Sequence, residues 1–400
     1  MTNTFKSLGI PSKILDALNA SKYIEPTPIQ QQVIPLALAD EDILGNAQTG
    51  TGKTAAFAIP AIAHLLKNSS DCVLVLLPTR ELASQVLIET KKIMGKSIKI
   101  PTALLIGGAS IDKQIKEIKL GARLIVGTPG RINDLLKQRK LRLGLTNFLV
   151  LDETDRMLDM GFGKQLESIV AEISPARQTL MLSATFPKNI MDLAGKYLHN
   201  PKRISCGQEN TVTDNLTQEL IRTTDELKYS VLSDLLDKQP DSVLVFAKTK
   251  YGTERLMKKL KKDKFLVCAL HGDLSQAKRE RAVSEFKSKK CNIMVATDIA
   301  ARGLDISHIG TVINYDLPQA AEDYIHRIGR TARAGADGTA INLLTTNDHK
   351  KWRDICKLLK VETGLPTEKK AVPLPKPTKA NKTSTQRPNR KRWFNKSKKK

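Results

Sequence analysis

The sequence of 400 residues contains no apolar run long enough to cross a membrane. Its longest apolar stretch extends from Ala55 to Ala63 and contains Pro60, whereas a spanning helix needs roughly 20 apolar residues. The first residues, MTNTFKSLGIP, form neither a cationic start with an apolar core nor an Arg-rich amphipathic presequence. We therefore expect no membrane partner, no signal for export or organelle import, and a cytoplasmic location.

Cysteine is scarce, and the few cysteines are not arranged in pairs. The five residues are Cys72, Cys206, Cys268, Cys291 and Cys356, an odd number with no CxxC spacing. This pattern argues against both a disulfide framework and a zinc site. It predicts reduced, buried thiols, as in a cytosolic protein.

Acidic residues are missing from the end of the chain. The chain has 65 Lys and Arg against 41 Asp and Glu, and a net charge of +24. Residues 369–400 contain thirteen Lys and Arg and no acid, which leaves +11 for the first 368 residues. Because so few apolar residues cannot offset the entropy of folding, we expect a disordered basic tail over 366–400. Trp393 and Phe394 lie inside the basic cluster, which favours a nucleic-acid tether over a solubilising tail or a targeting signal.

In the first 365 residues, short β-branched apolar runs alternate with longer amphipathic stretches. This rhythm predicts strand–helix units and parallel sheets, hence an α/β fold. A polar stretch, GQENTVTDNLT, divides the chain and predicts domains at 1–207 and 218–365 joined by a linker at 208–217. The expected strands are 42–46, 73–77, 103–106, 124–127, 148–151, 179–182, 242–246, 265–270, 292–296, 311–314 and 339–344.

A glycine-rich cluster, AQTGTGKT, follows the first expected strand and precedes an expected helix. Gly50 and Gly52 allow successive backbone N–H groups to face a phosphate, Lys53 reaches the β- and γ-phosphates, and the Thr54 hydroxyl can ligate Mg²⁺. The first position is Ala47, where the general phosphate-loop pattern has glycine. The alternative is an ordinary glycine-rich turn before a helix.

An acidic cluster follows the expected strand 148–151 directly. Asp152 would hold Mg²⁺, and Glu153 would orient and deprotonate an attacking water. A charged strand end on any surface is the alternative, and the pairing with Lys53 makes it the weaker one.

The segment HRIGRTARAG places Arg330 and Arg333 three residues apart, on one face of a helical turn. Two such guanidiniums could reach a γ-phosphate across an interdomain cleft. Taken by itself, the segment is more typical of a solvated, Arg-rich helix.

Together these motifs resemble the DEAD-box family of superfamily 2 RNA helicases, in the family's order and spacing, over about residues 5–345. The match includes Ala47, so the unusual first position of the phosphate loop is the family's own pattern. The elements that carry the resemblance are YIEPTPIQ (23–30), AQTGTGKT (47–54), PTRELA (78–83), the glycine pair 107–108, TPGR (128–131), DETD (152–155), SAT (183–185), VLVF (243–246), Gln276 with Arg279, ATDIAARGLD (296–305) and HRIGRTAR (326–333).

Three positions depart from the family pattern. Thr154 replaces the alanine of the signature tetrad, Ala332 replaces a glycine of the last motif, and Lys22 replaces a glycine often found before the aromatic at position 23. The acidic and arginine groups are all retained. We expect Lys22 to be tolerated at the start of a loop.

The resemblance implies two RecA-like domains in tandem, with ATP and Mg²⁺ as cofactors. Catalytic roles fall to Lys53, Glu153, Arg330 and Arg333, and Mg²⁺ ligation to Thr54 and Asp152. Gln30 would pair with adenine through its amide, which predicts ATP over GTP. The ATP site would comprise Phe5, Tyr23, Gln30, Ala47, Gln48, Thr49, Gly50, Thr51, Gly52, Lys53, Thr54 and Asp305. For Phe5 and Tyr23, plain core packing is an equal alternative.

The resemblance also implies an RNA groove that contacts phosphates and 2′-hydroxyls with little sequence preference. The groove would comprise Pro78, Thr79, Arg80, Gly107, Gly108, Thr128, Pro129, Gly130, Arg131, Gln276, Arg279 and Thr297. Communication between the domains would pass through Asp155, Ser183, Thr185, Asp298 and His326.

The implied activity is ATP-dependent local separation of RNA duplexes, or remodelling of RNA–protein complexes, by a monomer. The partners would be single-stranded RNA, short duplexes and ribonucleoproteins. The compact chain resembles bacterial members. Two alternatives stay open: a catalytically weak, ATP-gated RNA clamp, and a DNA-directed translocase of the same superfamily.

Overall fold

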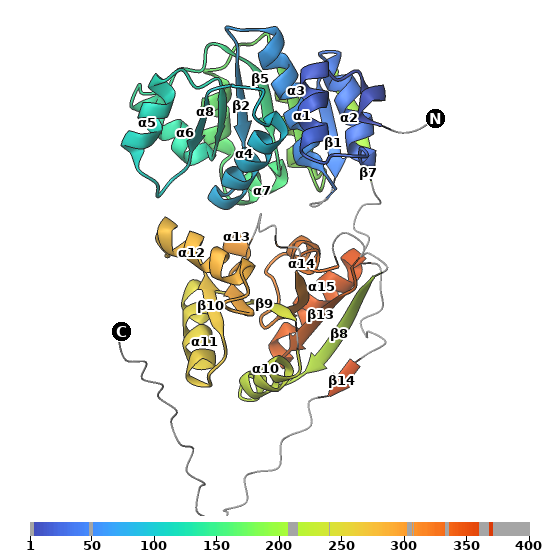
Figure 1. Cartoon of the computed structure of the whole chain (residues 1–400). Helices are drawn as coiled ribbons and strands as arrows, with labels where there is room; N and C mark the ends of the chain where they lie inside the picture. The colour runs from blue at the N-terminus through green and yellow to red at the C-terminus, as the bar shows by residue number, and fades with distance from the viewer. Residues whose placement is uncertain are drawn as a thin grey trace, which may run out of the picture.

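The computed structural model describes residues 4–47, 51–206, 215–239, 241–301, 306, 308–332, 336–359 and 368–370. Within these residues the chain forms two seven-stranded sheets, one in each domain, and every strand pairing in both is parallel. Figure 1 shows one domain above the other. The predicted α/β fold with two parallel-sheet domains is confirmed.

The first domain has the strand order β3-β4-β2-β5-β6-β1-β7. Its elements are η1 (Phe5–Leu8), α1 (Ser12–Ala20), α2 (Pro28–Leu38), β1 (Ile43–Ala47), α3 (Lys53–Lys67), β2 (Cys72–Leu76), α4 (Arg80–Met94), β3 (Thr102–Leu105), α5 (Ile111–Lys119), β4 (Leu124–Gly127), α6 (Pro129–Lys137), β5 (Thr146–Leu151), α7 (Thr154–Asp159), α8 (Gly163–Val170), β6 (Gln178–Ser183), α9 (Lys188–Tyr197) and β7 (Lys202–Cys206).

The second domain has the strand order β10-β11-β9-β12-β13-β8-β14. Its elements are β8 (Leu216–Arg222), α10 (Lys228–Asp237), β9 (Ser242–Phe246), α11 (Lys250–Lys262), β10 (Val267–Leu270), α12 (Gln276–Lys287), β11 (Ile293–Ala296), α13 (Asp298–Ala301), β12 (Ile309–Asn314), α14 (Ala321–Ile328), β13 (Gly338–Leu344), η2 (Thr346–Asp348), α15 (His349–Leu359) and β14 (Glu368–Lys370).

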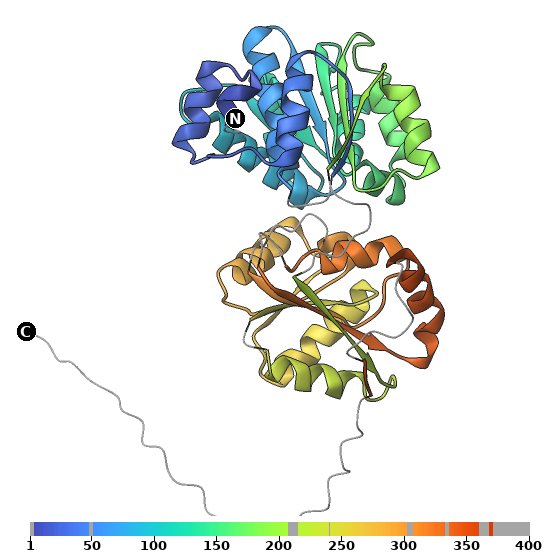
Figure 2. The same ribbon diagram turned by 90° about the vertical axis from the view of Figure 1, so that its right-hand side faces the viewer.

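The central strands of each sheet are buried on both faces because they are apolar at nearly every position. In β2, Val73 and Val75 pack with α1–α4, whereas Leu74 and Leu76 pack with α6, α8 and α9. The second sheet alternates in the same way, with α10 and α11 on one face and α12, α14 and α15 on the other. Figure 2 shows helices on both sides of each sheet. Continuous Val, Leu and Ile runs are typical of such doubly covered strands.

The strand order divides the carboxyl edge of the first sheet into two halves. Strands β5, β6 and β1 are neighbours, and their ends carry the acidic tetrad, the SAT motif and the phosphate loop. Strands β3, β4 and β2 are neighbours in the other half, and their ends carry the glycine pair, TPGR and PTRELA. Ligands of open parallel sheets bind at this edge, so the topology predicts two adjacent sites.

Two expectations need correction. Leu216 and Thr217, placed in the linker, are the first residues of β8. Residues 368–370, placed in the disordered tail, form β14, which pairs with Leu220–Arg222 of β8. Main-chain pairing explains this strand, because the open edge of β8 offers N–H and C=O groups to almost any sequence. The remainder of the expected tail lies outside the described residues.

The side chains of four of the five cysteines lie in the described part of the chain. Four cysteines are free thiols, of which Cys268, Cys291 and Cys356 are buried and Cys72 is half-buried. Among the described residues, no cluster of His, Cys, Asp or Glu could hold a metal ion by itself, and no helix has the length and apolarity of a membrane span.

Candidate functional site

The two domains face each other through the carboxyl edges of their sheets. Helices α4 and α7 of the first domain face α12, α13 and α14 of the second (Figure 1). A cavity of about 970 Å³ lies between them and takes residues from both domains. Of the predicted nucleotide-site residues, those that line it are Tyr23, Gln30, Gly52, Lys53, Thr54, Asp152, Glu153 and Arg330.

The centre of this cavity is a buried lysine beside a buried carboxylate. Lys53 begins α3, and its Nζ lies 3.7 Å from Oδ1 of Asp152 at the end of β5. The Lys53 ammonium has no hydrogen-bond partner in the described structure. Because a buried ammonium without a hydrogen-bond partner is costly, the site fits an anionic group such as a phosphate.

The acidic tetrad has an unusual backbone and perturbed electrostatics. Burial raises the pKa of Asp152, and the charge of Lys53 opposes that shift. Asp152 accepts a hydrogen bond from the backbone N–H of Glu153, whose φ of 49° lies in the left-handed region.

A buried carboxylate and the Thr54 hydroxyl on one cavity are oxygen donors suited to Mg²⁺, so these residues fit the ion.

Thr154, the residue of the tetrad that departs from the family pattern, is accommodated by the main chain around it. The side chain is fully buried, and its hydroxyl lies 3.2 Å from the carbonyl oxygens of both Leu151 and Leu182. The hydroxyl therefore bridges the ends of β5 and β6 and does not line the cavity. The extra polar group is satisfied by the main chain.

Gln30 is tied to the phosphate loop. Thr27 and Gln30 form a capping box at the start of α2, in which the Gln30 Oε1 accepts a hydrogen bond from the Thr27 N–H. The Gln30 Nε2 donates to the carbonyl oxygen of Gly52 at 3.0 Å. Gly52 has a φ of 94°, and a Cβ there would lie 2.5 Å from the Gln30 Nε2. An amide has two N–H donors and two acceptor lone pairs, so one of each is left for an adenine.

The two aromatic residues predicted to contact the base differ in position. Tyr23 lines the cavity, donates a hydrogen bond to Glu89 and lies under the Lys92 ammonium. Phe5 lies in the buried core, edge-on to Tyr23, with ring centroids 6.1 Å apart. Among the described residues, Phe5 and Thr51 are predicted site residues that do not line the cavity.

From the second domain, Arg330 reaches the same cavity. It follows α14, is buried, and its Nε donates to the carbonyl oxygen of His326 at 3.2 Å. Arg333, Asp305, Gln48, Thr49 and Gly50 lie outside the described residues, as does the side chain of Ala47.

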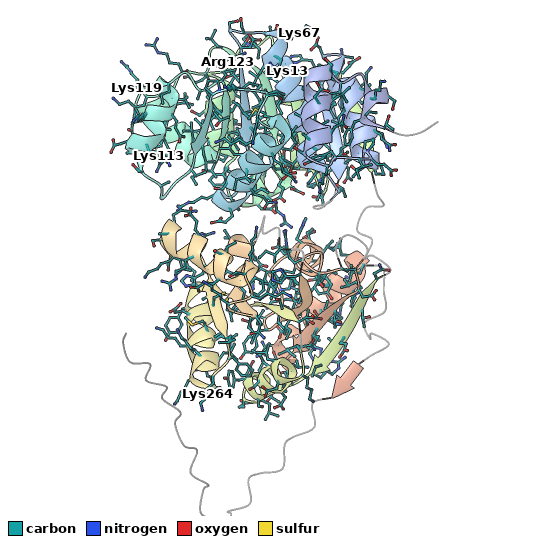
Figure 3. The ribbon with its side chains drawn as sticks, in the orientation of Figure 1. Lys13, Lys67, Lys113, Lys119, Arg123 and Lys264 are labelled. Atoms are coloured by element: carbon teal, nitrogen blue, oxygen red, sulfur yellow. The ribbon has the colours of Figure 1, made fainter. Side chains whose placement is uncertain are left out.

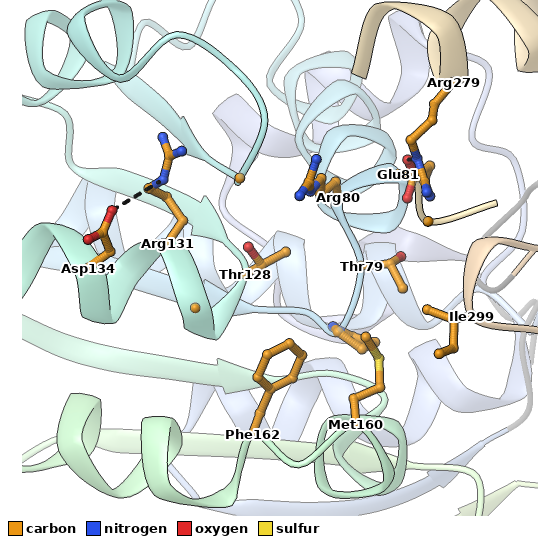
Figure 4. Close-up of a pocket in the computed structure, with 14 residues that line it drawn as sticks. Thr79, Arg80, Glu81, Thr128, Arg131, Asp134, Met160, Phe162, Arg279 and Ile299 are labelled. Carbon is orange, nitrogen blue, oxygen red and sulfur yellow. Dashed lines mark hydrogen bonds and ion pairs between the residues drawn. The ribbon is translucent and has the colours of Figure 1, made fainter. Parts of the chain in front are cut away.

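A second cavity, of about 460 Å³, lies at the other half of the sheet edge (Figure 4). The predicted groove residues that line it are Pro78, Thr79, Arg80, Gly107, Thr128, Gly130, Arg131 and Arg279. Gly108, Pro129, Gln276 and Thr297 are not among its lining, and Gln276 lines the nucleotide cavity instead.

The second cavity gathers three guanidinium groups. Burial, followed by the neighbouring charge of Arg279, lowers the pKa of Arg80, and Arg131 acts in the same direction. Arg131 keeps one buried Nη1 without a hydrogen-bond partner, although its Nε lies 3.8 Å from Asp134. The lining also contains the carboxylates of Glu81 and Asp134, and the positive charge that exceeds them fits a polyanionic backbone.

The glycine pair has a role that the sequence did not indicate. A Cβ at Gly108 would lie 2.1 Å from Nη1 of Arg80, and one at Gly107 would lie 3.1 Å from its Nη2. The two glycines therefore make room for the Arg80 side chain, and Gly108 has a φ of 75°.

The predicted coupling residues form two separate networks. In the first domain, Asp155 accepts hydrogen bonds from the backbone N–H groups of Ala184 and Thr185 at 3.1 Å, and Ser183 donates to the Thr185 carbonyl oxygen. In the second domain, Asp298 accepts from Arg327 at 2.7 Å. His326 lies in the last turn of α14, where its carbonyl oxygen accepts a hydrogen bond from Arg330.

Sequence reasoning missed several residues. Arg327 is fully buried and also donates to Asn314 and to the Asp316 carbonyl oxygen. Among the described residues, ion pairs that join the domains are Arg279 Nε to Glu81 Oε1 at 2.6 Å and Arg156 to Asp323. The only sequence signal was position. Arg156 directly follows the tetrad, Asp323 lies just before the last motif, and Arg327 lies within that motif.

Two departures from the family pattern occur at strained positions. Lys22 has a φ of 60° and Ala332 a φ of 54°, both in the left-handed region that favours glycine. The chain therefore tolerates side chains there at a cost in backbone strain.

The surface charge is not confined to the two cavities. Figure 3 labels Lys13, Lys67, Lys113, Lys119 and Lys264, which are exposed and lie away from the interdomain face. The positive charge of the described domains is therefore not confined to the cavities, whose arginines are less exposed: Arg279 and Arg330 are buried, and Arg80 and Arg131 are half-buried.

Comparison with known proteins agrees with this geometry. Residues 27–193 match the DEAD/DEAH box helicase model, and residues 227–335 match the helicase conserved C-terminal domain. DEAD-box ATP-dependent RNA helicase 20 of Arabidopsis thaliana is 41% identical over 365 residues, covering 89% of this chain and 73% of its own length. ATP-dependent RNA helicase CshA of Limosilactobacillus reuteri is 40% identical, with 89% and 72% covered.

Solved structures agree as well. S. cerevisiae Dbp5 bound to RNA and ADP BeF3 matches with a TM-score of 0.83 and 31% identity, covering 92% of this chain and 96% of that one. The chain spans between 46% and 73% of the length of the curated relatives considered. On both lines of similarity, the chain belongs to the DEAD-box family of ATP-dependent RNA helicases.

Proposed function

We propose that this chain hydrolyses ATP in the interdomain cavity and uses the closure of its two domains to separate short RNA duplexes or remodel RNA–protein complexes. The observation that carries the proposal is the shared cavity, which brings Lys53 and Glu153 of one domain to Arg330 of the other. The arginine-lined groove lies on the same interdomain face. A single closing motion would therefore act on both sites.

Each residue has a chemical part in the proposed reaction. Lys53 would contact the β- and γ-phosphates, Glu153 would orient and deprotonate the attacking water, and Arg330 would stabilise the charge that develops on the transferred phosphoryl group. Arg333 would act with Arg330. Thr54 and Asp152 would hold Mg²⁺, which would neutralise phosphate charge when bound. Gln30 would select adenine through its remaining donor and acceptor.

The RNA strand would lie in the groove with its phosphates near Arg80, Arg131 and Arg279. Contacts to phosphate and ribose carry no sequence information, so binding would show little sequence preference. Because both ligands would favour the closed arrangement, RNA would tighten ATP binding and ATP would tighten RNA binding by the same factor. We further propose a monomer of the bacterial type that acts in the cytoplasm, with ribonucleoproteins among its partners.

The geometry supports turnover over a non-hydrolysing clamp. A clamp would result if Thr154, the substituted residue of the tetrad, disturbed the catalytic groups. The Thr154 hydroxyl is hydrogen-bonded to the main chain and does not line the nucleotide cavity. Glu153, the general base of the proposal, lines that cavity.

The test is RNA-stimulated ATP turnover of the wild type against Glu153→Gln. We expect the variant to bind ATP and RNA but to lose at least about a hundredfold in kcat, the range typical of a lost general base. Equal turnover of the two proteins in the presence of RNA would support the clamp instead. Stimulation by duplex DNA and not by RNA would support a DNA translocase.

A further inference from the structure

An ion pair outside the predicted motifs joins the two domains. Arg156 lies on α7 directly after the acidic tetrad and is 3% exposed. Its Nη1 contacts the carboxylate of Asp323, which lies in the first turn of α14 in the second domain. The Asp323 side chain is 14% exposed, so both charges are largely withdrawn from water.

The surroundings of Arg156 make Asp323 its main partner. The other nearby carboxylate, Asp159, lies 3.5 Å from the same Nη1, belongs to the same helix and has a side chain that is 54% exposed. The second terminal nitrogen, Nη2, is buried and has no hydrogen-bond partner in the described structure. Removal of one partner of such a pair leaves a buried charge poorly compensated, which is strongly unfavourable.

On the first-domain side, the pair adjoins the residues that link the tetrad to the SAT motif. The backbone N–H of Arg156 donates to Oδ1 of Asp155 at 2.9 Å. The other oxygen of Asp155 accepts the backbone N–H groups of Ala184 and Thr185. The backbone at Arg156 is therefore held by the same carboxylate that binds the backbone of the SAT motif.

On the second-domain side, the pair holds the helix that leads to Arg330. Helix α14 runs from Ala321 to Ile328, and Arg330, which lines the nucleotide cavity, follows two residues after its end. Arg327 on the same helix is fixed to Asp298 and Asn314 in its own domain. A contact at Asp323 therefore sets where the whole unit of α14 and Arg330 lies over the first domain.

We propose that Arg156 and Asp323 are positioning residues, which set the placement of Arg330 in the closed arrangement and touch neither ATP nor RNA. The proposal rests on the proposed function for the role of Arg330. It requires that loss of the pair lower kcat and weaken the coupling between ATP and RNA. ATP binding in the absence of RNA should be unchanged, because Lys53, Gln30 and Asp152 all lie in the first domain.

The experiment compares Asp323→Asn with two matched controls. Glu322→Gln removes the same charge one position earlier on α14 at an exposed site, and Asp159→Asn removes the other carboxylate near Arg156. RNA-stimulated ATPase activity gives kcat and the KM for ATP, and thermal unfolding reports on the fold. We expect Asp323→Asn to lower kcat at least tenfold with the melting temperature and RNA-free ATP affinity unchanged, and both controls to stay within twofold of wild type.

A second readout follows closure itself. Fluorescent dyes at positions 113 and 264, exposed sites in different domains, report the interdomain distance by energy transfer when an ATP analogue and RNA are added. Asp323→Asn should shift the population toward the open arrangement. In a double-mutant cycle, Arg156→Gln with Asp323→Asn should lose no more than the worse single variant, because the pair acts as a unit.

The outcomes separate the two proposals. If Asp323→Asn closes and turns over like wild type, or loses activity only as much as Glu322→Gln, the positioning role is wrong. If the wild type has no RNA-stimulated turnover, the proposed function is wrong, and energy transfer alone still decides whether the pair stabilises closure. Additive losses in the cycle would also overturn the proposal.

Discussion

Removal of the Thr154 hydroxyl by Thr154→Ala should destabilise the first domain moderately and leave catalysis almost intact. The hydroxyl lies 3.2 Å from two carbonyl oxygens, so the substitution removes one shared hydrogen bond with a net contribution of about 0.5–1.5 kcal/mol. Burial of the lost methyl group contributes about 0.8 kcal/mol more, and the higher helix propensity of alanine returns about 0.5 kcal/mol. The expected loss in the free energy of unfolding is therefore about 1–2 kcal/mol.

The assay has two parts that distinguish a structural from a catalytic role. For a domain of this size, a loss of about 1–2 kcal/mol lowers the melting temperature by roughly 2–8 °C. RNA-stimulated kcat should stay within about threefold of wild type, because the hydroxyl does not line the nucleotide cavity. An unchanged melting temperature together with a tenfold change in kcat would refute this reasoning, since the hydroxyl would then act on the nucleotide or the attacking water.

Three further predictions follow from strain, contact and charge. Ala332→Gly relieves a left-handed alanine and should raise the free energy of unfolding of the second domain by about 0.5–1 kcal/mol, measured by thermal unfolding; a lower stability would contradict the strain. Gly52→Ala drives a Cβ against Gln30 and should weaken binding of a fluorescent ATP analogue at least tenfold, whereas Gly195→Ala, with open space around it, should not; equal affinities would show that the loop adapts. Deletion of residues 371–400, which leaves β14 intact, should weaken RNA binding and flatten its salt dependence, by as much as ~0.7 per lost phosphate contact, without changing RNA-saturated kcat; an unchanged salt slope would count against the tether.

The sequence was sufficient to predict the fold class and the residues that meet at the edge of the first sheet. Lys53, Asp152 and Ser183 each follow or end a buried strand, and parallel strands bring their carboxyl ends to one edge. The two-part division of that edge, into β5-β6-β1 and β3-β4-β2, depends on strand order, which the motifs alone do not specify.

Among the described strands, β7, β8 and β14 escaped prediction for a physical reason. In β7, KRISC, Ile204 is the one buried side chain among Lys202–Ser205, the part of the strand whose side chains are described, and in β8, LTQELIR, only Leu220 and Ile221 are buried. Strands that bury so few side chains need no apolar run, so their sequences read as polar connections. Strand β14 pairs with β8 through the main chain, and no apolar run in the sequence predicts it.

Contacts between the domains were the other part that sequence could not supply. Arg156 and Asp323 are 167 positions apart, and Arg279 and Glu81 are 198 apart. Neither pair follows from helical or strand periodicity, since each depends on how two separately folded sheets are placed. The predicted networks of Asp155 and Asp298, by contrast, each lie within a single domain.

The most direct test of the central claim is the separation of a short RNA duplex with a fluorescent strand, measured alongside ATP hydrolysis. We predict separation that requires ATP, that fails with ADP, and that is lost in Glu153→Gln under multiple-turnover conditions. Separation that proceeds equally without ATP, or that occurs with duplex DNA and not with RNA, would contradict the account.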